Sequence, residues 1–344
     1  MHLDAARMFY PVDWIHSLLE RMAGLGLNAF QWHFSENEGV RLASDGFPEI
    51  VSEEHITRGQ AAELIAHARE LRIDVVPSLD MPGHLRQALA AHPELRLPSV
   101  GGVDTSHALD ITNPVARDFA KRLIDDYAPV FVDSTSWNLG GDEFVDFARI
   151  EDYPALAAEA QRRFGPSATA FDLLTDFINE IAEHLIQRGF TPRAWNDGLF
   201  RSTLVALDPR VEITWWTNWH PAMRPVADAF AAGHRVLNFD DRHWYYVVGQ
   251  NAGYWHPTAE RAWADDWHPG LFPPLTDGGA RQEWQQPYPD LLAGAYFSIW
   301  SDRGGESLEE ITRRIQLPLA AFAERARHGG SELSFAEFVA RASG

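Results

Sequence analysis

The feature that most constrains the fold is a regular alternation of short apolar runs with longer amphipathic segments. Short runs rich in β-branched and aromatic residues indicate buried strands, whereas the longer segments repeat their apolar residues with helical spacing. The candidate strands are 3–6, 27–34, 73–79, 136–139, 192–195, 211–216, 235–239 and 293–300. The candidate helices, most with a capping residue or proline at the start, are 13–24, 57–71, 114–127, 171–188 and 221–232. Eight strands, each followed by a helix, predict a (β/α)8 TIM barrel of the α/β class.

The length fits this barrel as a single catalytic domain. A chain of 344 residues suits one large domain, and α/β barrels commonly use such a length. We therefore expect residues 1–344 to form the barrel, with no separate upstream domain.

One segment interrupts the alternation. Residues 240–290, after the seventh candidate strand, form a long stretch rich in Trp, Pro and Gly. Long loops in compact domains are usually functional or disordered, and tryptophans argue against disorder. We expect a lid or subsite wall inserted at the mouth of the barrel; the alternative is a small satellite core on its flank.

Charge and cysteine content exclude several classes of protein. The formal net charge is −20, which argues against nucleic acid, anionic membranes and polyanionic substrates. The chain contains no cysteine, which excludes disulfides, thiolate nucleophiles and cysteine-based zinc sites. No apolar run approaches the roughly 20 residues that span a bilayer. The first residues do not resemble a signal peptide, so we expect a cytoplasmic protein, or a secreted one if the N-terminus is truncated.

The strongest chemical signal is the run Gly140-Gly141-Asp142-Glu143 at the end of a candidate strand. Glycine allows a sharp turn and the close approach of a substrate. Adjacent carboxyl groups in different surroundings can differ in pKa, so that one acts as an acid while its neighbour stays ionised. The alternative is an ordinary helix N-terminus, where acidic residues are favourable. The glycines and the position at a barrel strand end favour a catalytic pair.

Polar residues follow other strands as well. Asp80 and His84 flank a Pro-Gly turn, and His33 begins a run that continues through Glu36 and Glu38. Barrel active sites lie at the carboxyl ends of the strands, so we expect these groups to form a polar network around Glu143.

Taken together, these motifs resemble glycoside hydrolase family 20, the β-N-acetylhexosaminidases and lacto-N-biosidases. The similarity runs from Leu3 to about Arg303, and its six ordered motifs are 3–7, 33–41, 80–84, 140–143, 194–197 and 297–302. The resemblance implies a retaining exo-glycosidase that acts on terminal β-linked GlcNAc or GalNAc without a protein nucleophile, one of the substrate-assisted exceptions to the two-carboxylate scheme. It implies no metal and no cofactor, and it leaves the oligomeric state open.

The resemblance also implies a role for each motif. Glu143 matches the general acid and base, and Asp142 matches the residue that orients the acetamido group of the sugar. The residues implied to contact substrate or to surround the acid are Arg7, His33, Asp80, His84, Trp195, Trp216, Tyr245, Trp300 and Asp302. The sequence departs from the family pattern at three points. The small α/β domain that family members often carry upstream is absent, and position 302 is Asp where many members have Glu. The family tyrosine is not uniquely placed, and we choose Tyr245 over Tyr246 and His243.

Four alternatives remain open at this level. The enzyme could release a disaccharide, as lacto-N-biosidases do. A two-carboxylate glycosidase would need a nucleophile about 5 Å from the acid, usually on another strand. A metal-dependent hydrolase lacks support, because no His-x-His or His-Glu-x-x-His spacing occurs. The last alternative is a non-catalytic glycan-binding barrel, since a fold alone does not prove activity.

Overall fold

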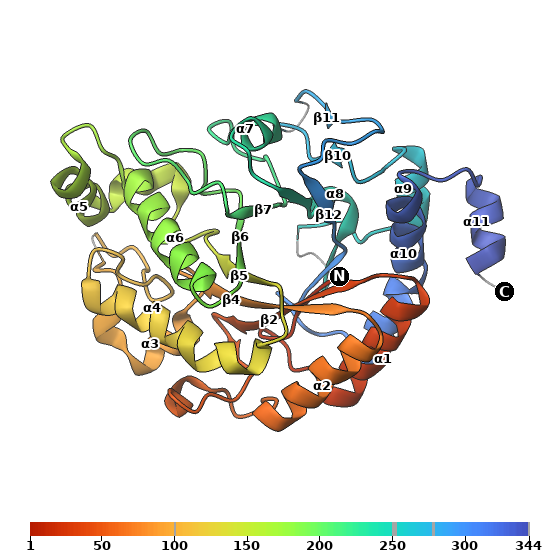
Figure 1. The fold of residues 1–344 in the computed structure, drawn as a ribbon, viewed down its shortest axis with the longest axis horizontal. Helices are drawn as coiled ribbons and strands as arrows, with labels where there is room; N and C mark the ends of the chain where they lie inside the picture. The colour runs from red at the N-terminus through yellow and green to blue at the C-terminus, as the bar shows by residue number, and fades with distance from the viewer. Residues whose placement is uncertain (100, 250–252, 277–278, 343–344) are drawn as a thin grey trace.

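The computed structural model describes residues 1–99, 101–249, 253–276 and 279–342. At its centre, neighbouring strands pair in parallel in chain order (Figure 1). These strands are β1 (His2–Asp4), β2 (Ala29–Glu36), β4 (Asp74–Met81), β5 (Ser136–Gly140), β6 (Thr191–Trp195), β7 (Glu212–Trp215) and β8 (Val236–Asn238). A short β3 (Gly39–Val40) folds back on β2 as an antiparallel hairpin. The predicted strands are confirmed to within a few residues.

The barrel closes through two interrupted strands. β12 (Leu292–Ala295) pairs with β8, and β13 (Ser298–Trp300) pairs with both β1 and β9 (Tyr245–Val247). The predicted single strand 293–300 is therefore divided. The register shifts between Leu292 and Gly294, and the chain changes its pairing partner before Ser298. This change lets the last strand reach the first and complete the ring.

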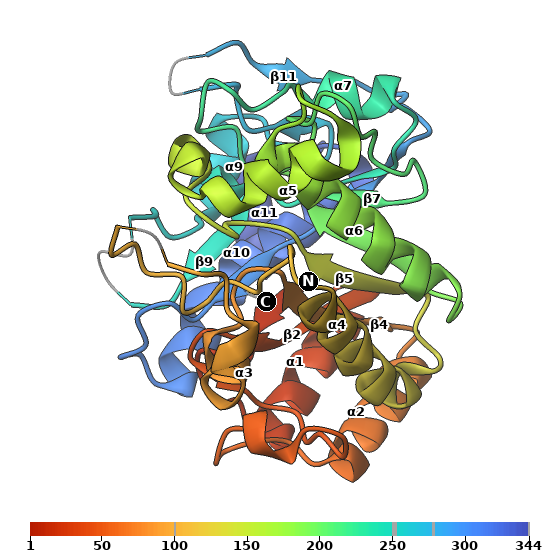
Figure 2. The same ribbon diagram turned by 90° about the vertical axis from the view of Figure 1, so that its left-hand side faces the viewer.

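Helices surround the sheet, as the two views at right angles show (Figures 1 and 2). The α-helices are α1 (Val12–Gly24), α2 (Arg58–Glu70), α3 (Arg86–Ala91), α4 (Pro114–Tyr127), α5 (Pro154–Phe164), α6 (Ala170–Ile186), α7 (Val226–Ala231), α8 (Asp241–Trp244), α9 (Ala259–Ala264), α10 (Leu308–His328) and α11 (Phe335–Ala342). Short 3-10 turns are η1 (Pro48–Ile50), η2 (Pro93–Leu95), η3 (Ala128–Phe131) and η4 (Phe147–Asp152).

The predicted helix starts follow from capping. Thr57 caps α2 and forms a reciprocal capping box with Gln60. Asn113 accepts a hydrogen bond from the Val115 backbone N–H, and Pro114 occupies the first helical position of α4. These side chains satisfy backbone donors that a helix leaves unpaired at its start.

Two expectations about helices are wrong. The helix predicted over 221–232 begins only at Val226, because Pro225 disfavours helical geometry in the residue before it. A helix does not follow every strand either: residues 196–211, between β6 and β7, contain no α-helix. That connection packs instead through turns, with the N–H groups of Thr203, Leu204 and Val205 bonded to the carboxylate of Asp172 on α6.

The Trp-rich segment 240–290 contains its own helices and strands. Residues 250–252 and 277–278 of this segment lie outside the described residues, as do residues 343–344 at the end of the expected domain. It contains α8, β9, α9 and the two-stranded ribbon of β10 (Leu271–Phe272) and β11 (Gln282–Glu283). Trp244 and Trp267 are fully buried against Phe322 of α10, Trp263 and Trp284 pack on the same core, and Trp255 is 84% exposed. Only part of the segment therefore faces solvent.

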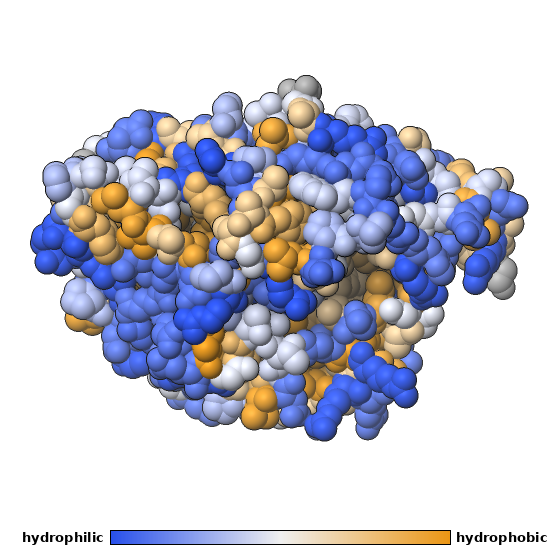
Figure 3. All heavy atoms as spheres, turned by 45° about the horizontal axis from the view of Figure 1, so that its top comes forward, coloured by the Kyte–Doolittle hydropathy of each residue, from blue (hydrophilic) through white to orange (hydrophobic). Residues whose placement is uncertain are grey.

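The surface contrasts with this apolar core. On the face drawn in Figure 3, hydrophilic residues predominate and hydrophobic ones form small patches. Within the described residues, no helix is both long enough and apolar enough to cross a bilayer.

The capping box of α2 gives a stability prediction. Thr57→Ala removes the acceptor for the Gln60 N–H and should lower the free energy of unfolding by about 1 kcal/mol. Chemical denaturation would measure this as a lower midpoint. Ser202→Ala, a similar truncation in the loop after β6, is the matched control and should leave the midpoint nearly unchanged. Equal midpoints for Thr57→Ala and the parent would contradict the assigned cap.

Candidate active site

A pocket of about 510 Å³, counted to its open mouth, lies at the carboxyl ends of the barrel strands. Its walls come from segments far apart in the chain: Arg7, His84, Asp142, Glu143, Trp195, Trp216, Tyr245, Val247, Tyr254, Trp300 and Asp302. Nine of the predicted site residues lie in this wall. His33 and Asp80 do not.

A glycine turn places the two acidic residues. Gly140 and Gly141 have φ angles of 87° and 95°, a region that side chains other than glycine rarely adopt. A Cβ at Gly140 would lie 2.8 Å from the Cα of Asp80. The turn therefore requires glycine both for its backbone conformation and for the close contact between β5 and β4.

The two acidic side chains experience different surroundings. The Asp142 side chain is 11% exposed, whereas that of Glu143 is 54% exposed at the rim. Burial and the nearby Asp80 carboxyl raise the pKa of Asp142 well above its ordinary value. The pair thus presents one enclosed carboxyl group and one that can exchange protons with solvent.

A histidine joins this pair to a third acidic residue. His84 Nδ1 lies 2.6 Å from Glu36 Oε1, and His84 Nε2 lies 3.5 Å from Asp142 and 3.7 Å from Glu143. Burial alone would lower the pKa of His84, but Glu36 and Asp142 outweigh it and hold the pKa well above its ordinary value. Burial would likewise raise the pKa of Glu36, but His84 and Arg7 keep it low. Glu36 and His84 therefore form a buried ion pair.

Arg7 provides the fixed positive charge of the pocket. Its guanidinium lies 2.9 Å from Asp4, 2.7 Å from Glu36 and 3.9 Å from Asp302. It also lies over the ring of Trp300, 5.5 Å from the centroid, a cation–π arrangement. Asp302 is 42% exposed, so this carboxylate and the edge of the guanidinium can meet hydroxyl groups of a ligand.

Aromatic rings form the opposite wall. Trp195, Trp216, Tyr245 and Trp300 belong to one buried cluster. The rings of Trp216 and Tyr245 are parallel, with centroids 6.1 Å apart, and Trp300 contacts both Tyr245 and Trp195. Of the three candidates for a pocket hydroxyl, Tyr245 lines the cavity, Tyr246 donates to Glu306, and His243 pairs with Asp240 and Asp265. The geometry favours Tyr245.

Asp197 links this wall to the acidic pair. One of its oxygens accepts the Glu143 backbone N–H at 3.0 Å, and the other accepts the Trp216 indole N–H at 3.1 Å. Burial and the nearby Glu143 raise the pKa of Asp197 to about 6. This bridge holds Glu143 at a fixed place relative to the tryptophan.

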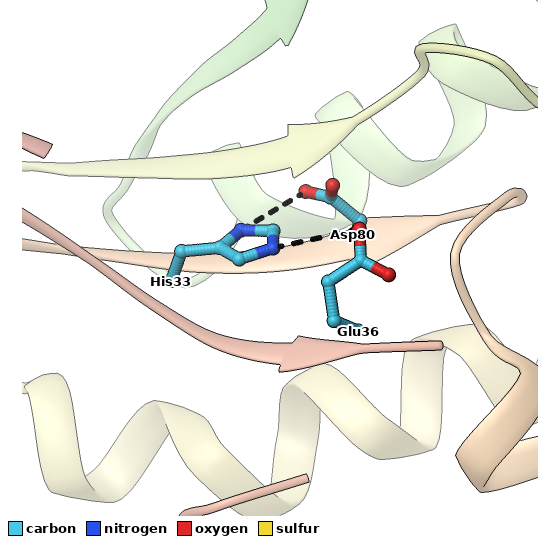
Figure 4. A group of neighbouring side chains, drawn as sticks. All are labelled: His33, Glu36 and Asp80. Atoms are coloured by element: carbon cyan, nitrogen blue, oxygen red, sulfur yellow. Dashed lines mark ion pairs between the residues drawn. The ribbon is translucent and has the colours of Figure 1, made fainter. Parts of the chain in front are cut away.

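His33 and Asp80 are buried and do not line the pocket. Figure 4 shows the His33 side chain between those of Asp80 and Glu36. His33 Nδ1 lies 3.0 Å from the Ser78 hydroxyl and 3.7 Å from Asp80, and His33 Nε2 lies 4.0 Å from Glu36. These contacts form a polar network of the kind expected. Neither residue lines the pocket, so their contact with a substrate stays a prediction.

The same residues supply the only groupings near the pocket, within the described chain, that could hold a metal ion. Candidate ligand atoms of His33, Glu36 and Asp80, and of Asp80, His84 and Asp142, lie within 4.8 Å of one another. However, Glu36 is already paired with His84 and with Arg7. The positive guanidinium opposes a second cation at that point.

Two pocket residues, Val247 and Tyr254, escaped prediction. Glu36 does not line the pocket; it was expected in the polar network, but its pairing with His84 was not. Val247 could have been found, since residues two apart on a strand share a face and it follows Tyr245 by two. Tyr254, which contacts Tyr245 with ring centroids 5.8 Å apart, lies in an irregular connection without a sequence signal.

Comparison with known proteins identifies the family. The family model described as "Glycosyl hydrolase family 20, catalytic domain" matches residues 1–329. Lacto-N-biosidase of Bifidobacterium bifidum is 30% identical over 87% of this chain and 25% of its own length. β-Hexosaminidase subunit A2 of Dictyostelium discoideum is 26% identical over 77% of this chain and 47% of its own. The chain thus spans a quarter to a half of these curated relatives.

Solved structures support the fold. The β-N-acetylhexosaminidase of Bacteroides fragilis superposes with a TM-score of 0.79 at 22% identity, covering 99% of this chain and 68% of that one. At such low identity the likeness concerns the fold alone. It agrees with the barrel expected from the sequence.

The Glu36–His84 pair gives a prediction about pH. A histidine with a raised pKa stabilises the fold below its unfolded pKa of about 6.5, and a carboxylate with a lowered pKa does so above about 4.3. Glu36→Gln should therefore cost about 3 kcal/mol of unfolding free energy between these values. The loss should shrink as pH rises through the raised pKa of His84 and its charge disappears. Denaturation midpoints across pH would test this. Glu38→Gln, at a half-exposed position 3.5 Å from Arg7, is the control and should cost little at any pH.

Proposed function

The chain belongs to glycosyl hydrolase family 20, and from this we propose that it removes a terminal β-linked N-acetylhexosamine from a glycan with retention of configuration. The observation that carries the proposal is the adjacent pair formed by an enclosed Asp142 and a rim-exposed Glu143 in a tryptophan-lined pocket. A glycosidase with a protein nucleophile needs a second carboxyl group about 5 Å from the acid, across the scissile bond. Here the enclosed carboxyl is the neighbour in sequence and faces the aromatic pocket, which suits a reaction assisted by the substrate's acetamido group.

In the first step, the acetamido carbonyl oxygen attacks the anomeric carbon and the glycosidic bond breaks. Glu143 gives its proton to the leaving oxygen, since its half-exposed position at the rim meets the aglycone. Water then attacks the anomeric carbon of the oxazolinium intermediate from the side of the departed aglycone, and its proton passes to Glu143. Each step inverts the configuration at the anomeric carbon, so the configuration is retained overall.

Asp142 and the aromatic wall serve the acetamido group. The ionised Asp142 accepts the acetamido N–H and stabilises the positive charge that develops on the ring. Trp195, Trp216 and Trp300 enclose the methyl group, so that the carbonyl oxygen points towards the anomeric carbon. The Tyr245 hydroxyl donates to that oxygen. Fixing this geometry before reaction lowers the entropic cost of ring closure.

Arg7 and Asp302 hold the far side of the sugar. A guanidinium and a carboxylate side by side can bind two neighbouring hydroxyl groups, and charged hydrogen bonds are the stronger kind. These contacts orient the non-reducing sugar and favour exo-action, because nothing beyond the terminal residue is needed for binding.

A second candidate is release of a disaccharide. The Asp302 side chain is one methylene shorter than that of Glu, and its Oδ2 lies 3.9 Å from Arg7 Nη1. This separation provides space beside the non-reducing sugar. The 30% identity with a protein named lacto-N-biosidase favours the same possibility.

A substrate panel tests both candidates. We expect release of nitrophenol from the β-N-acetylglucosaminide or β-N-acetylgalactosaminide and none from the plain β-glucoside, which has no acetamido group. Release from the β-lacto-N-bioside alone would favour the disaccharide. Turnover of the glucoside would support a protein nucleophile, a loss of turnover with chelator would support a metal, and binding without any turnover would support a non-catalytic barrel.

Two variants separate the roles of the acidic pair. Glu143→Gln should lower turnover of substrates with poor leaving groups by about 10² or more, yet still bind a thiazoline mimic of the intermediate. Asp142→Asn should lower turnover by a similar factor of about 10² and also weaken that inhibitor, because the charge opposite the acetamido group is lost. Glu332→Gln, at an exposed position after α10, is the control. Near-normal rates for both active-site variants would contradict the assignment.

A further inference from the structure

One buried side chain joins the aromatic wall of the pocket to the proposed acid. Asp197, which follows β6, is 2% exposed and does not line the pocket. One of its carboxyl oxygens accepts the Glu143 backbone N–H at 3.0 Å, and the other accepts the Trp216 indole N–H at 3.1 Å. Asp197 therefore contacts the acid and a pocket tryptophan at once, without touching the sugar itself.

Glu143 depends on this contact because its backbone is strained. Its φ angle is 41°, in the left-handed region that residues with a Cβ adopt only at a cost in energy. Such a conformation persists where neighbouring groups hold it. The bond from the Glu143 N–H to Asp197 provides this restraint. Loss of the bond would let the backbone relax and would move the carboxyl group away from the leaving oxygen.

The contact with Trp216 is specific to that ring. The indole N–H of Trp195, in the same wall, is buried without a hydrogen-bond partner among the described residues. The Trp216 backbone is held as well, since its N–H donates to Asn196 Oδ1 at 2.9 Å and its carbonyl accepts the Asp241 N–H at 3.1 Å. The neighbours Asn196 and Asp197 thus hold the backbone and the ring of Trp216, and a displacement of the ring acts directly on Asp197.

Close packing makes this link stiff. A Cβ at Gly198, the residue after Asp197, would lie 2.7 Å from the Phe147 ring and 3.0 Å from the Leu174 side chain. The connection after β6 is therefore packed directly on the connection after β5, which carries Glu143. Groups packed this closely transmit small displacements instead of absorbing them.

We propose that Asp197 makes the placement of the acid depend on the N-acyl group of the bound sugar. The inference rests on the proposed function and adds a positioning residue to it. An N-acetyl group leaves Trp216 in place, so Asp197 keeps Glu143 in the strained conformation that reaches the leaving oxygen. A longer N-acyl group displaces the Trp216 ring, the ring displaces Asp197, and Glu143 loses its position. The site thus discriminates against longer N-acyl groups in the proton transfer as well as in binding.

Two acyl groups combined with two leaving groups test the proposal in the parent protein. The measured quantity is kcat/KM for phenyl and dinitrophenyl glycosides of the accepted sugar, each in N-acetyl and N-propionyl form. The N-propionyl penalty should be larger by about tenfold for the phenyl glycosides, because a poor leaving group needs the proton from Glu143 and a good one does not. Equal penalties for the two leaving groups would overturn the proposal, whereas turnover of the N-acetyl substrates would leave the proposed function standing.

Variants that break the link should abolish this difference. Asp197→Asn keeps the size of the side chain, but its NH2 group cannot accept an N–H. It should lower kcat/KM for the phenyl N-acetyl substrate by about tenfold, leave the dinitrophenyl substrate nearly unchanged, and make the N-propionyl penalty equal for both leaving groups. Equal losses for the two N-acetyl substrates would overturn the proposal, because they would show a general structural defect.

A pair of tryptophan variants provides the matched control. Trp216→Phe removes the indole N–H that reaches Asp197 and should also equalise the N-propionyl penalties. Trp195→Phe makes the same change at a ring whose N–H has no partner among the described residues. Whatever it costs in overall rate, it should keep the larger penalty for the phenyl glycosides. Equal penalties in Trp195→Phe, or unequal penalties in Trp216→Phe, would overturn the proposal.

Hydrogen exchange tests the link without turnover. In the ¹⁵N-labelled protein, the backbone amide of Glu143 should exchange slowly with solvent although its side chain is 54% exposed. Trp216→Phe should accelerate this exchange by about fivefold, as expected for one weakened hydrogen bond, and Trp195→Phe should not. An unchanged Glu143 amide in Trp216→Phe would overturn the proposal. Inactivity on the substrate panel would refute the proposed function, while the exchange rates would still decide whether Asp197 links the two residues.

Discussion

The rest of the structure depends on the carboxylate of Asp4 and the guanidinium it holds. Asp4 accepts the backbone N–H of Ser301 at 3.0 Å and a guanidinium N–H of Arg7 at 2.9 Å, so one buried charge ties the first strand to the end of the last. Arg7 then reaches Glu36 on the second strand. The contacts that close the barrel therefore also place the Arg7 guanidinium in the pocket wall. Removing either partner would leave a buried charge unpaired at the seam, which is far more costly than losing an exposed ion pair.

Further polar contacts connect this seam to the catalytic pair. Glu36 fixes His84, His84 faces Asp142 and Glu143, and Asp197 holds the Glu143 backbone against Trp216. Each link joins the end of one strand to that of its neighbour, as parallel strands in a barrel allow. Chemistry and stability therefore share the same contacts, and burial by the surrounding strands raises the pKa values of Asp142 and Asp197.

The aromatic wall complements these charges. Three tryptophans and a tyrosine come from the later strands, whereas the carboxyl groups and the histidines come mostly from the earlier ones. The two halves of the barrel thus face each other across the pocket, one apolar and one polar. A sugar with an apolar acetamido methyl and polar ring hydroxyls matches such a division. The family relationship covers nearly the whole chain, while the curated relatives are considerably longer.

Periodicity along the chain predicted the barrel class and most strand positions, because it is a local signal that needs no coordinates. The resemblance to the family, carried by motifs at the strand ends, implied nine of the residues that line the pocket. The sequence did not determine that the last strand divides between Ala295 and Ser298, that the connection after β6 lacks an α-helix, or that Tyr254 reaches the pocket from an irregular connection. It also placed His33 and Asp80 with the substrate-binding groups, although both are buried and do not line the pocket. These outcomes depend on distances between residues far apart in the chain. The same holds for protonation, since whether Asp80 and Asp142 repel each other is decided only when β4 and β5 pack side by side and exclude water.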